Sequence, residues 1–361
     1  MTQQIAATPI VKLYNDLHAK GTSRKQKLER ARAFVADPTA LAAMFGESVA
    51  AMQAYAPDDE GFYTRRSHYD VGAKVTGTID FALHVRDAGG IDSRAGSHAP
   101  LEGEPIDAPG VESLTAERVR WEYLDRELVA TRSTGGATQA KGSAIRLDLL
   151  LKQVEDGTPV IAELKRTTDI DDDNPDKKLA TDKDAFSALV QALACVSQLA
   201  TPAQYARLSR FGRARSCEAG HEVGMDAGLA FATPPTFDVA VVLHNRPTST
   251  HLPELTIEAE RLSALLLAQP VVARYVRRIV CIIAETEGDG VASSVEFAYQ
   301  RQPPGNPRSR PRSVSTSDRG ACTSRARRRS GRLTDSCTDA DGAFAGAGTA
   351  PERSSSVPPT G

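Results

Sequence analysis

The chain has 361 residues, 40% of them hydrophobic, which suffices for one large or two ordinary domains with a buried core. Its formal net charge of −2 at pH 7 excludes a uniformly basic nucleic-acid-binding protein, although it is compatible with a local basic patch. None of the five Cys forms a Cys-x-x-Cys pair, and no run of about 18 apolar residues is present. The first ten residues have no basic region followed by an apolar run, so we expect no signal peptide. We therefore expect reduced thiols, a cytoplasmic location and no membrane partner.

The first part of the chain, residues 1–110, is predicted to be mainly helical. Apolar residues recur at helical spacing after residue 8, Ser23 is a candidate N-cap of a second helix, and a third is expected from about Thr39 to Ala54. Alternating apolar residues at 79–85 predict a strand. The basic residues of the second helix have two interpretations, a solvated face, which is favoured, and contacts to phosphates.

A Gly-, Pro- and Ser-rich segment, residues 87–110, is the predicted boundary to a second region, residues 111–300. This region is predicted to begin with a helix over residues 115–131, because apolar residues recur there at helical spacing, namely Trp121, Leu124 and Leu128.

Two apolar runs, residues 145–151 and 160–164, flank an Asp-Gly pair that is typical of a tight hairpin turn. If the loop consists of those two residues, Asp148 lies opposite Lys165 and Leu150 lies opposite Glu163. Side chains alternate along a strand, so Asp148, Glu163 and Lys165 share one face and the other face is wholly apolar. The sequence therefore predicts two acids and a lysine on one patch of an otherwise apolar hairpin.

This patch has a definite chemistry. Two carboxylates within about 8 Å repel each other unless a cation lies between them. Oxygen ligands suit Mg²⁺ or Mn²⁺, which retain waters and bind substrate phosphate. The lysine could orient or deprotonate the attacking water, or stabilise charge on the phosphate, so the residues suit metal-assisted hydrolysis of a phosphodiester.

Asp148, followed after fourteen residues by Glu163-Leu164-Lys165, resembles the motif of the PD-(D/E)xK nuclease superfamily. Leu147 stands where that motif has Pro. The resemblance covers roughly residues 115–285 and implies a restriction-endonuclease-like αββαβ core. It also implies a catalytic Asp148, Glu163 and Lys165, with Mg²⁺ or Mn²⁺ held by the two acids.

The RecB-like branch of this superfamily carries Gln-x-x-x-Tyr on the following helix. Gln191 matches the Gln and is a further expected catalytic residue, whereas Cys195 replaces the Tyr. The superfamily often has an extra metal-facing acid on the helix before the hairpin. Glu117 is the first candidate metal ligand of this kind and Glu127 the second. The alternative for Glu117 is an acid that merely favours a helix start.

The remaining elements agree with an α/β fold. A helix is expected over about 184–200 and another over about 256–268, and two continuous apolar runs predict buried strands at 237–243 and 279–283. This order indicates a mixed sheet with helices on its faces.

Residues 301–361 are rich in Arg, Pro, Ser and Gly and have no apolar periodicity, so this tail is predicted to be disordered. We hypothesise that it results from a frameshift near Gln300; a genuine basic tail that holds nucleic acid is the alternative.

The favoured function is thus a Mg²⁺-dependent endo- or exonuclease. Its expected partner is nucleic acid, taken to be DNA. A homodimer is compatible with this function. The first alternative is a non-catalytic nucleic-acid or protein-binding module on the same fold. The second is a surface charge cluster on an unrelated α/β fold.

Overall fold

The computed structural model describes residues 7–19, 21–53, 63–64, 78–94, 108–114, 117–129, 145–166, 184–202, 204–205, 208, 235–244, 253–287 and 290–302. One compact unit runs from Met1 to Asn306, and the predicted boundary near residue 110 falls inside it. The predicted disordered tail lies outside the described residues, apart from its first two.

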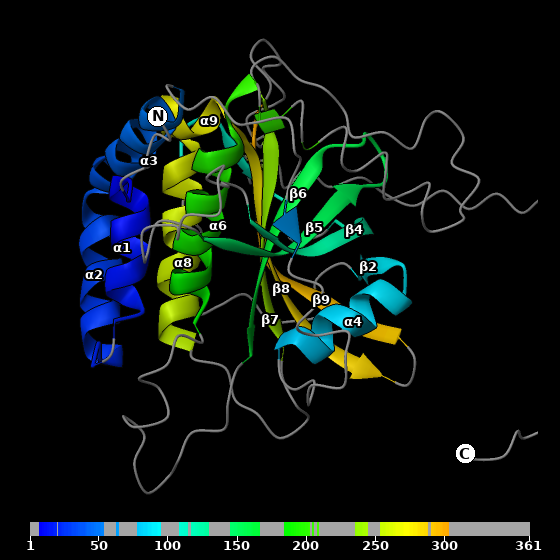
Figure 1. Cartoon of the computed structure of the whole chain (residues 1–361). Coiled ribbons are helices and arrows are strands. Elements are labelled where there is room, and N and C mark those ends of the chain that lie inside the picture. Colours follow the sequence, from blue (N-terminus) through cyan, green and yellow to red (C-terminus); the bar gives the residue numbers. More distant parts are fainter. Residues whose placement is uncertain are drawn as a thin grey trace, which may run out of the picture. The chain divides into compact units, whose positions relative to one another are not determined.

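A nine-stranded mixed sheet forms the centre of this unit (Figure 1). Its order is β1-β4-β5-β6-β7-β8-β9-β3, and β2 pairs with β4 beside this path. Strands β4, β5 and β6 are antiparallel, β6, β7 and β8 are parallel, and β9 returns antiparallel to β8. The strands are β1 (Tyr63–Thr64), β2 (Gly90–Ser93), β3 (Val111–Ser113), β4 (Val119–Val129), β5 (Arg146–Gln153), β6 (Pro159–Arg166), β7 (Phe237–His244), β8 (Val276–Glu287) and β9 (Gly290–Arg301).

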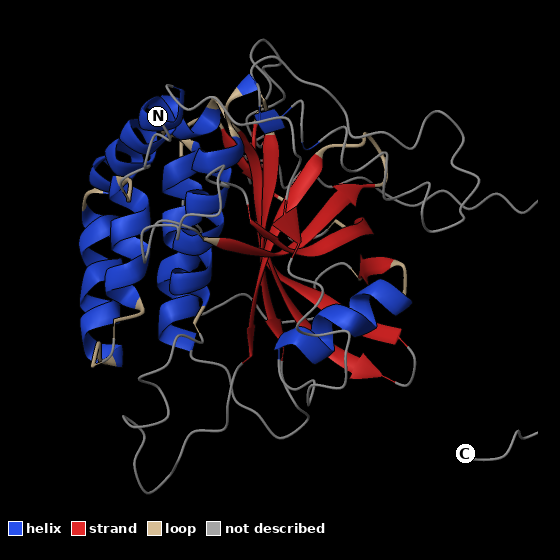
Figure 2. Cartoon of the chain, in the orientation of Figure 1, coloured by secondary structure: helices blue, strands red, loops and turns tan. Residues whose placement is uncertain are grey.

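Helices cover both faces of the sheet, unequally (Figure 2). On one face α6 and α8 lie against the strands, and α1, α2 and α3 form an outer layer over them. On the opposite face α4 packs against β4 and β9. The helices are α1 (Pro9–Leu17), α2 (Arg24–Ala36), α3 (Pro38–Gln53), α4 (Thr78–Asp87), α6 (Ala185–Leu199), α8 (Pro253–Leu267) and α9 (Pro270–Ala273).

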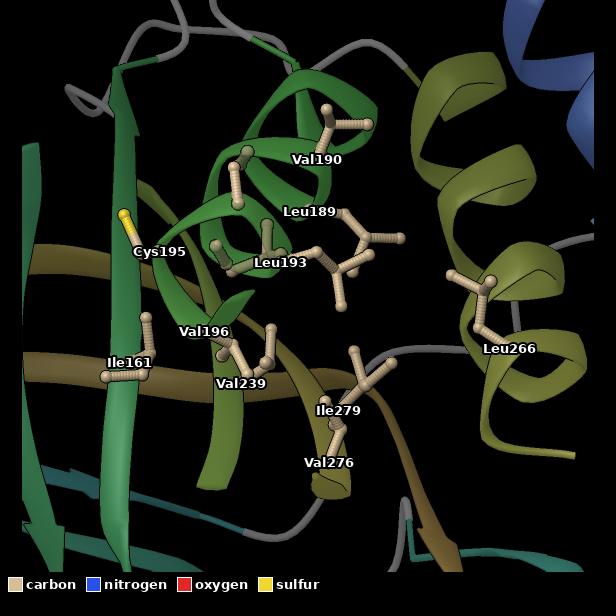
Figure 3. Close-up of a cluster of buried hydrophobic side chains, with 14 of the residues drawn as sticks. Ile161, Leu189, Val190, Leu193, Cys195, Val196, Val239, Leu266, Val276 and Ile279 are labelled. Atoms are coloured by element: carbon tan, nitrogen blue, oxygen red, sulfur yellow. The ribbon is translucent and has the colours of Figure 1, made fainter. Parts of the chain in front are cut away.

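Helix α6 is the centre of the larger hydrophobic core. Every one of its residues is buried, because the sheet lies on one side and α1 and α3 lie on the other. Figure 3 shows Leu189 and Leu193 of α6 beside Val239 of β7 and Ile279 of β8. A helix that is apolar nearly all round is suited to such a buried place. Any polar side chain on α6 must therefore find its partner inside the protein.

The helical N-terminus agrees with the prediction, as do α6, α8, β7 and β8. Ser23 caps α2 in a capping box with Gln26. Two basic residues of α2 join it to other elements, since Lys27 pairs with Asp184 at 3.2 Å and Arg32 pairs with Glu258 at 3.2 Å. The mixed α/β class is thus confirmed, and the restriction-endonuclease-like core stays a prediction.

The predicted strand at 79–85 is wrong, since these residues belong to α4. Phe81, Ala82 and Val85 are the buried positions, which is one face of a helix and not every second residue of a strand. Phe81 stacks on His244 at the end of β7, with ring centroids 4.6 Å apart. The alternation was ambiguous because Phe81 and Val85 are also one helical turn apart.

The predicted helix at 115–131 is also wrong, since Val119–Val129 is strand β4. A β-bulge between Tyr123 and Asp125 inserts one residue into its pairing with β5. Trp121 therefore joins the core beneath α4, whereas Leu124 and Leu128 join the core beneath α6. Their helical spacing arises from this change of phase along a strand.

In the parts of the chain that the structure describes, no helix has both the length and the apolar composition to cross a membrane.

Candidate functional site

The hairpin of β5 and β6 carries the predicted site, but its turn differs from the expected one. The loop has four residues, 154–157, and is closed by a hydrogen bond from the Gln153 N–H to the Thr158 carbonyl, 2.9 Å. The Asp156 side chain accepts from the Thr158 N–H at 3.0 Å, and Gly157 takes φ +72°. The register is therefore shifted by two residues from the prediction, and because two is the period of a strand, the faces are unchanged.

The shift brings the two acids closer together than predicted. The backbone pairing of β5 with β6 reaches Leu149 and Ala162, and one further step in this register places Asp148 opposite Glu163. At that point Asp148 Oδ2 accepts a hydrogen bond from the Leu164 N–H at 2.9 Å. The Asp148 side chain thus continues the contact between the strands where the backbone ladder ends.

Glu163 is the most unusual acid of the site. It is 0% exposed, and its Oε2 has no hydrogen-bond partner among the described residues. Burial raises the pKa of the Glu163 carboxyl well above its ordinary value, and the negative charge of Asp148 raises it further, while Lys165 acts in the opposite direction. An ionised carboxylate in this place needs a positive charge, which the protein supplies only in part.

Lys165 lies on the same face, and α6 holds its ammonium group. Its Nζ donates to Gln191 Oε1 at 2.6 Å and lies 4.0 Å from Asp148 Oδ2. Gln191 Nε2 in turn donates to the Arg146 carbonyl of β5 at 3.1 Å. The Gln191 amide is therefore fixed by β5 and orients Lys165, so the structure brings together all four residues expected to be catalytic.

Cys195 is a member of the site whose role the sequence reasoning left open. Its Sγ donates to Glu163 Oε1 at 3.4 Å, and both side chains are completely buried. Burial raises the pKa of the Cys195 thiol well above its ordinary value, and the Glu163 charge raises it further. The spacing of four residues from Gln191 was the sequence signal for this contact.

Glu117 is not part of this constellation. Glu117 is exposed at a bend before β4. The position in β4 that lies beside Asp148 is that of Glu127, and the strand from Val119 to Glu127 spans about 26 Å, so Glu117 is far from Asp148. The second candidate, Glu127, is different. Its neighbours Arg126 and Leu128 pair with Leu149 and Leu147, so the position of Glu127 in β4 lies opposite Asp148.

The described side chains include no group of three or more His, Cys, Asp or Glu arranged to hold a metal ion. No protein-family model matches the chain, and no curated protein or solved structure matches it either. The interpretation of the site therefore depends on its geometry and on the motif.

Proposed function

We propose that this protein is a metal-dependent nuclease that hydrolyses phosphodiester bonds of DNA. The observation that carries the proposal is the buried Oε2 of Glu163, which has no hydrogen-bond partner in the described part of the chain and lies in the position opposite Asp148. DNA is the substrate class that the resemblance to PD-(D/E)xK nucleases implies. The order of β5, β6, α6 and β7 supports a core of that kind, with the bulged strand β4 in the place expected for its first helix.

The donor set fits a hard divalent cation. Asp148 and Glu163 supply carboxylate oxygens from neighbouring strands, and one oxygen of Glu163 has no other described partner. Such ligands are those that Mg²⁺ and Mn²⁺ prefer, and two carboxylates with water and substrate phosphate are a common set. A cation held there would polarise the phosphate and make a bound water more acidic.

The protein's own residues would do the rest of the work. Lys165, held by Gln191, has its ammonium group on the same face as both acids. From there it can orient the attacking water and stabilise the charge that develops on the phosphate. Asp148, fixed by the Leu164 N–H, keeps its carboxylate toward Lys165 without a change of side-chain conformation.

The exposure of the side chains indicates where substrate would approach. The side chains of Asp148 and Lys165 are 15% and 10% exposed, whereas Glu163 is 0% exposed. The substrate phosphate would therefore approach Asp148 and Lys165, and Glu163 would bind the metal from the buried side of the site.

Cleavage of supercoiled plasmid and single-stranded DNA by the full chain, in Mg²⁺, Mn²⁺ or EDTA, tests the proposal. Wild type should cut only with the metal, and Glu163→Gln and Lys165→Ala should lower the rate by at least about 100-fold. Glu260→Gln is the matched control, because burial also raises the pKa of the Glu260 carboxyl, which lies outside the site. Folded wild type that binds DNA but never cuts it would overturn the nuclease proposal and favour the binding module.

A further inference from the structure

The two oxygens of the Glu163 carboxylate have different surroundings. Oε1 accepts the thiol proton of Cys195 at 3.4 Å, whereas Oε2 has no hydrogen-bond partner among the described residues. The Cys195 side chain projects from α6 toward β6, the strand of Ile161 (Figure 3). The last torsion of a glutamate is broad, so a donor on one oxygen favours one rotation of the carboxylate and thereby biases where Oε2 lies.

The helix and the strand are matched in spacing. Gln191 and Cys195 are four residues apart on α6, a rise of about 6 Å, and Glu163 and Lys165 are two residues apart on β6, a rise of about 6.6 Å. Gln191 contacts Lys165, and Cys195 contacts Glu163. Two polar groups on an otherwise apolar helix thus each hold one charged group of the strand.

We propose that Cys195 is a positioning residue that holds Glu163 so that its free oxygen is presented to a metal ion shared with Asp148. This inference rests on the proposed nuclease function, because it assigns Cys195 a part in metal binding. Cys195 does not touch the substrate or the metal; it acts through Glu163. In many metal sites, residues that do not touch the metal orient its ligands by hydrogen bonds, and Cys195 would affect metal binding in the same way.

A thiol suits this place physically. Its body behaves as a small apolar side chain and fits among the leucines and valines of the core, while the S–H retains a weak donor. The alternative is that Cys195 only fills space. Loss of stability cannot separate the two interpretations, because removal of any buried side chain is destabilising. Metal affinity can separate them, since space filling predicts no change in it.

The main experiment compares Cys195→Ala and Cys195→Ser with Cys281→Ala in the full chain. Cys281 is the matched control because it is also a completely buried free thiol, on β8. Mn²⁺ binding is measured directly by calorimetry, and the Mn²⁺ concentration that gives half-maximal cleavage is measured beside it. Cys195→Ala should weaken Mn²⁺ binding by about tenfold. Cys195→Ser, which keeps a donor, should recover most of that loss, and Cys281→Ala should bind as wild type does.

A spectroscopic measurement tests the hydrogen bond without using activity. The infrared S–H stretching band of Cys195 is the difference between the wild-type spectrum and that of Cys195→Ala. Glu163→Gln should shift this band, because it replaces a charged or carboxyl acceptor by an amide. A band that does not move would overturn the contact on which the proposal stands.

The outcomes separate this inference from the proposed function. Wild type that cleaves DNA with Mn²⁺, together with a folded Cys195→Ala that binds Mn²⁺ equally well, would overturn the positioning role alone. Wild type that neither binds Mn²⁺ nor cleaves would overturn the nuclease proposal and the positioning role with it.

Discussion

Lys27 of α2 and Asp184 at the start of α6 form an ion pair of 3.2 Å in which both side chains are almost completely buried. Asp184 also caps α6, since its Oδ1 accepts from the Ser187 N–H at 2.5 Å. One carboxylate therefore joins the outer helical layer to the helix that holds Gln191 and Cys195. The contact between α2 and α6 is thus a polar one at this point, inside an apolar core.

Removal of one partner of this pair should be strongly destabilising. Lys27→Ala leaves the Asp184 carboxylate buried without its cation, and the free energy of unfolding should fall by about 3–5 kcal/mol. Urea denaturation measures this change. Lys25→Ala is the control, because Lys25 forms an exposed pair with Glu29 and its loss should change stability by about 0.5 kcal/mol or less. Equal effects of the two substitutions would contradict this account of the core.

The pairing of β2 with β4 depends on a glycine. Gly90 has φ +147°, and a Cβ built on it would lie 2.0 Å from the Trp121 carbonyl oxygen. Gly90→Ala should therefore push β2 away from β4 and destabilise the protein more than Gly89→Ala. The neighbour is a matched control because Gly89 also has a positive φ of +75°, while a Cβ there meets nothing within 4 Å. Thermal unfolding of both variants measures the difference, and similar transition temperatures would argue against a close approach at Gly90.

The candidate site was predictable because its determinants are local. Asp148, Glu163 and Lys165 lie on two strands of one hairpin, and strand alternation alone assigns them to a common face. The two-residue error in register came from the turn, where the Asp156 side chain and Gly157 close a four-residue loop. That error left the faces intact, so the grouping of these three residues was predicted correctly even though the opposing pairs were wrong.

The errors in β4 and α4 have a different origin. The bulge at Leu124 gave strand β4 an apolar spacing that is typical of a helix. The bulge depends on the pairing of β4 with β5, and no local sequence pattern reveals that pairing. For α4, the choice between helix and strand was decided by packing of Phe81 and Val85 on the sheet. Contacts that are distant in sequence decided both cases, and they also decided that Glu117 is remote from the site.

The stability of the metal-free protein should depend on pH through Glu163. Its pKa is raised in the folded state by burial and by Asp148, so its contribution to stability is complete below the unfolded pKa of about 4.3. That contribution is lost as the pH rises through the folded pKa, with a slope of up to about 1.4 kcal/mol per pH unit. In EDTA, Glu163→Gln should therefore lose less stability than wild type as the pH rises above the unfolded pKa, because the glutamine has no proton to lose.

Urea midpoints at a series of pH values measure this difference. Other carboxyls with raised pKa values, those of Asp238 and Glu260, are present in both proteins and cancel in the comparison. Parallel pH profiles of wild type and variant would show that Glu163 does not titrate as its surroundings require.

Gln191 provides the sharpest test of how α6 serves the site. Gln191→Leu removes the acceptor of the Lys165 ammonium and the donor to the Arg146 carbonyl, while it keeps an apolar side chain of similar size in the buried helix. If Lys165 acts only when it is held in place, the rate of metal-dependent cleavage at saturating DNA should fall by about 10- to 100-fold. The half-saturating DNA concentration should change little, because the ammonium charge itself remains.

The same substitution at Gln198 controls for the loss of a buried glutamine from α6. Gln198 is 2% exposed and lies nearly two turns beyond Gln191, so Gln198→Leu should leave the cleavage rate near that of wild type. Equal losses in the two variants would mean that the rate reports the packing of α6. A loss confined to Gln191→Leu would mean that the rate depends on the position of Lys165, because both variants change the helix in the same way and only one of them releases the lysine.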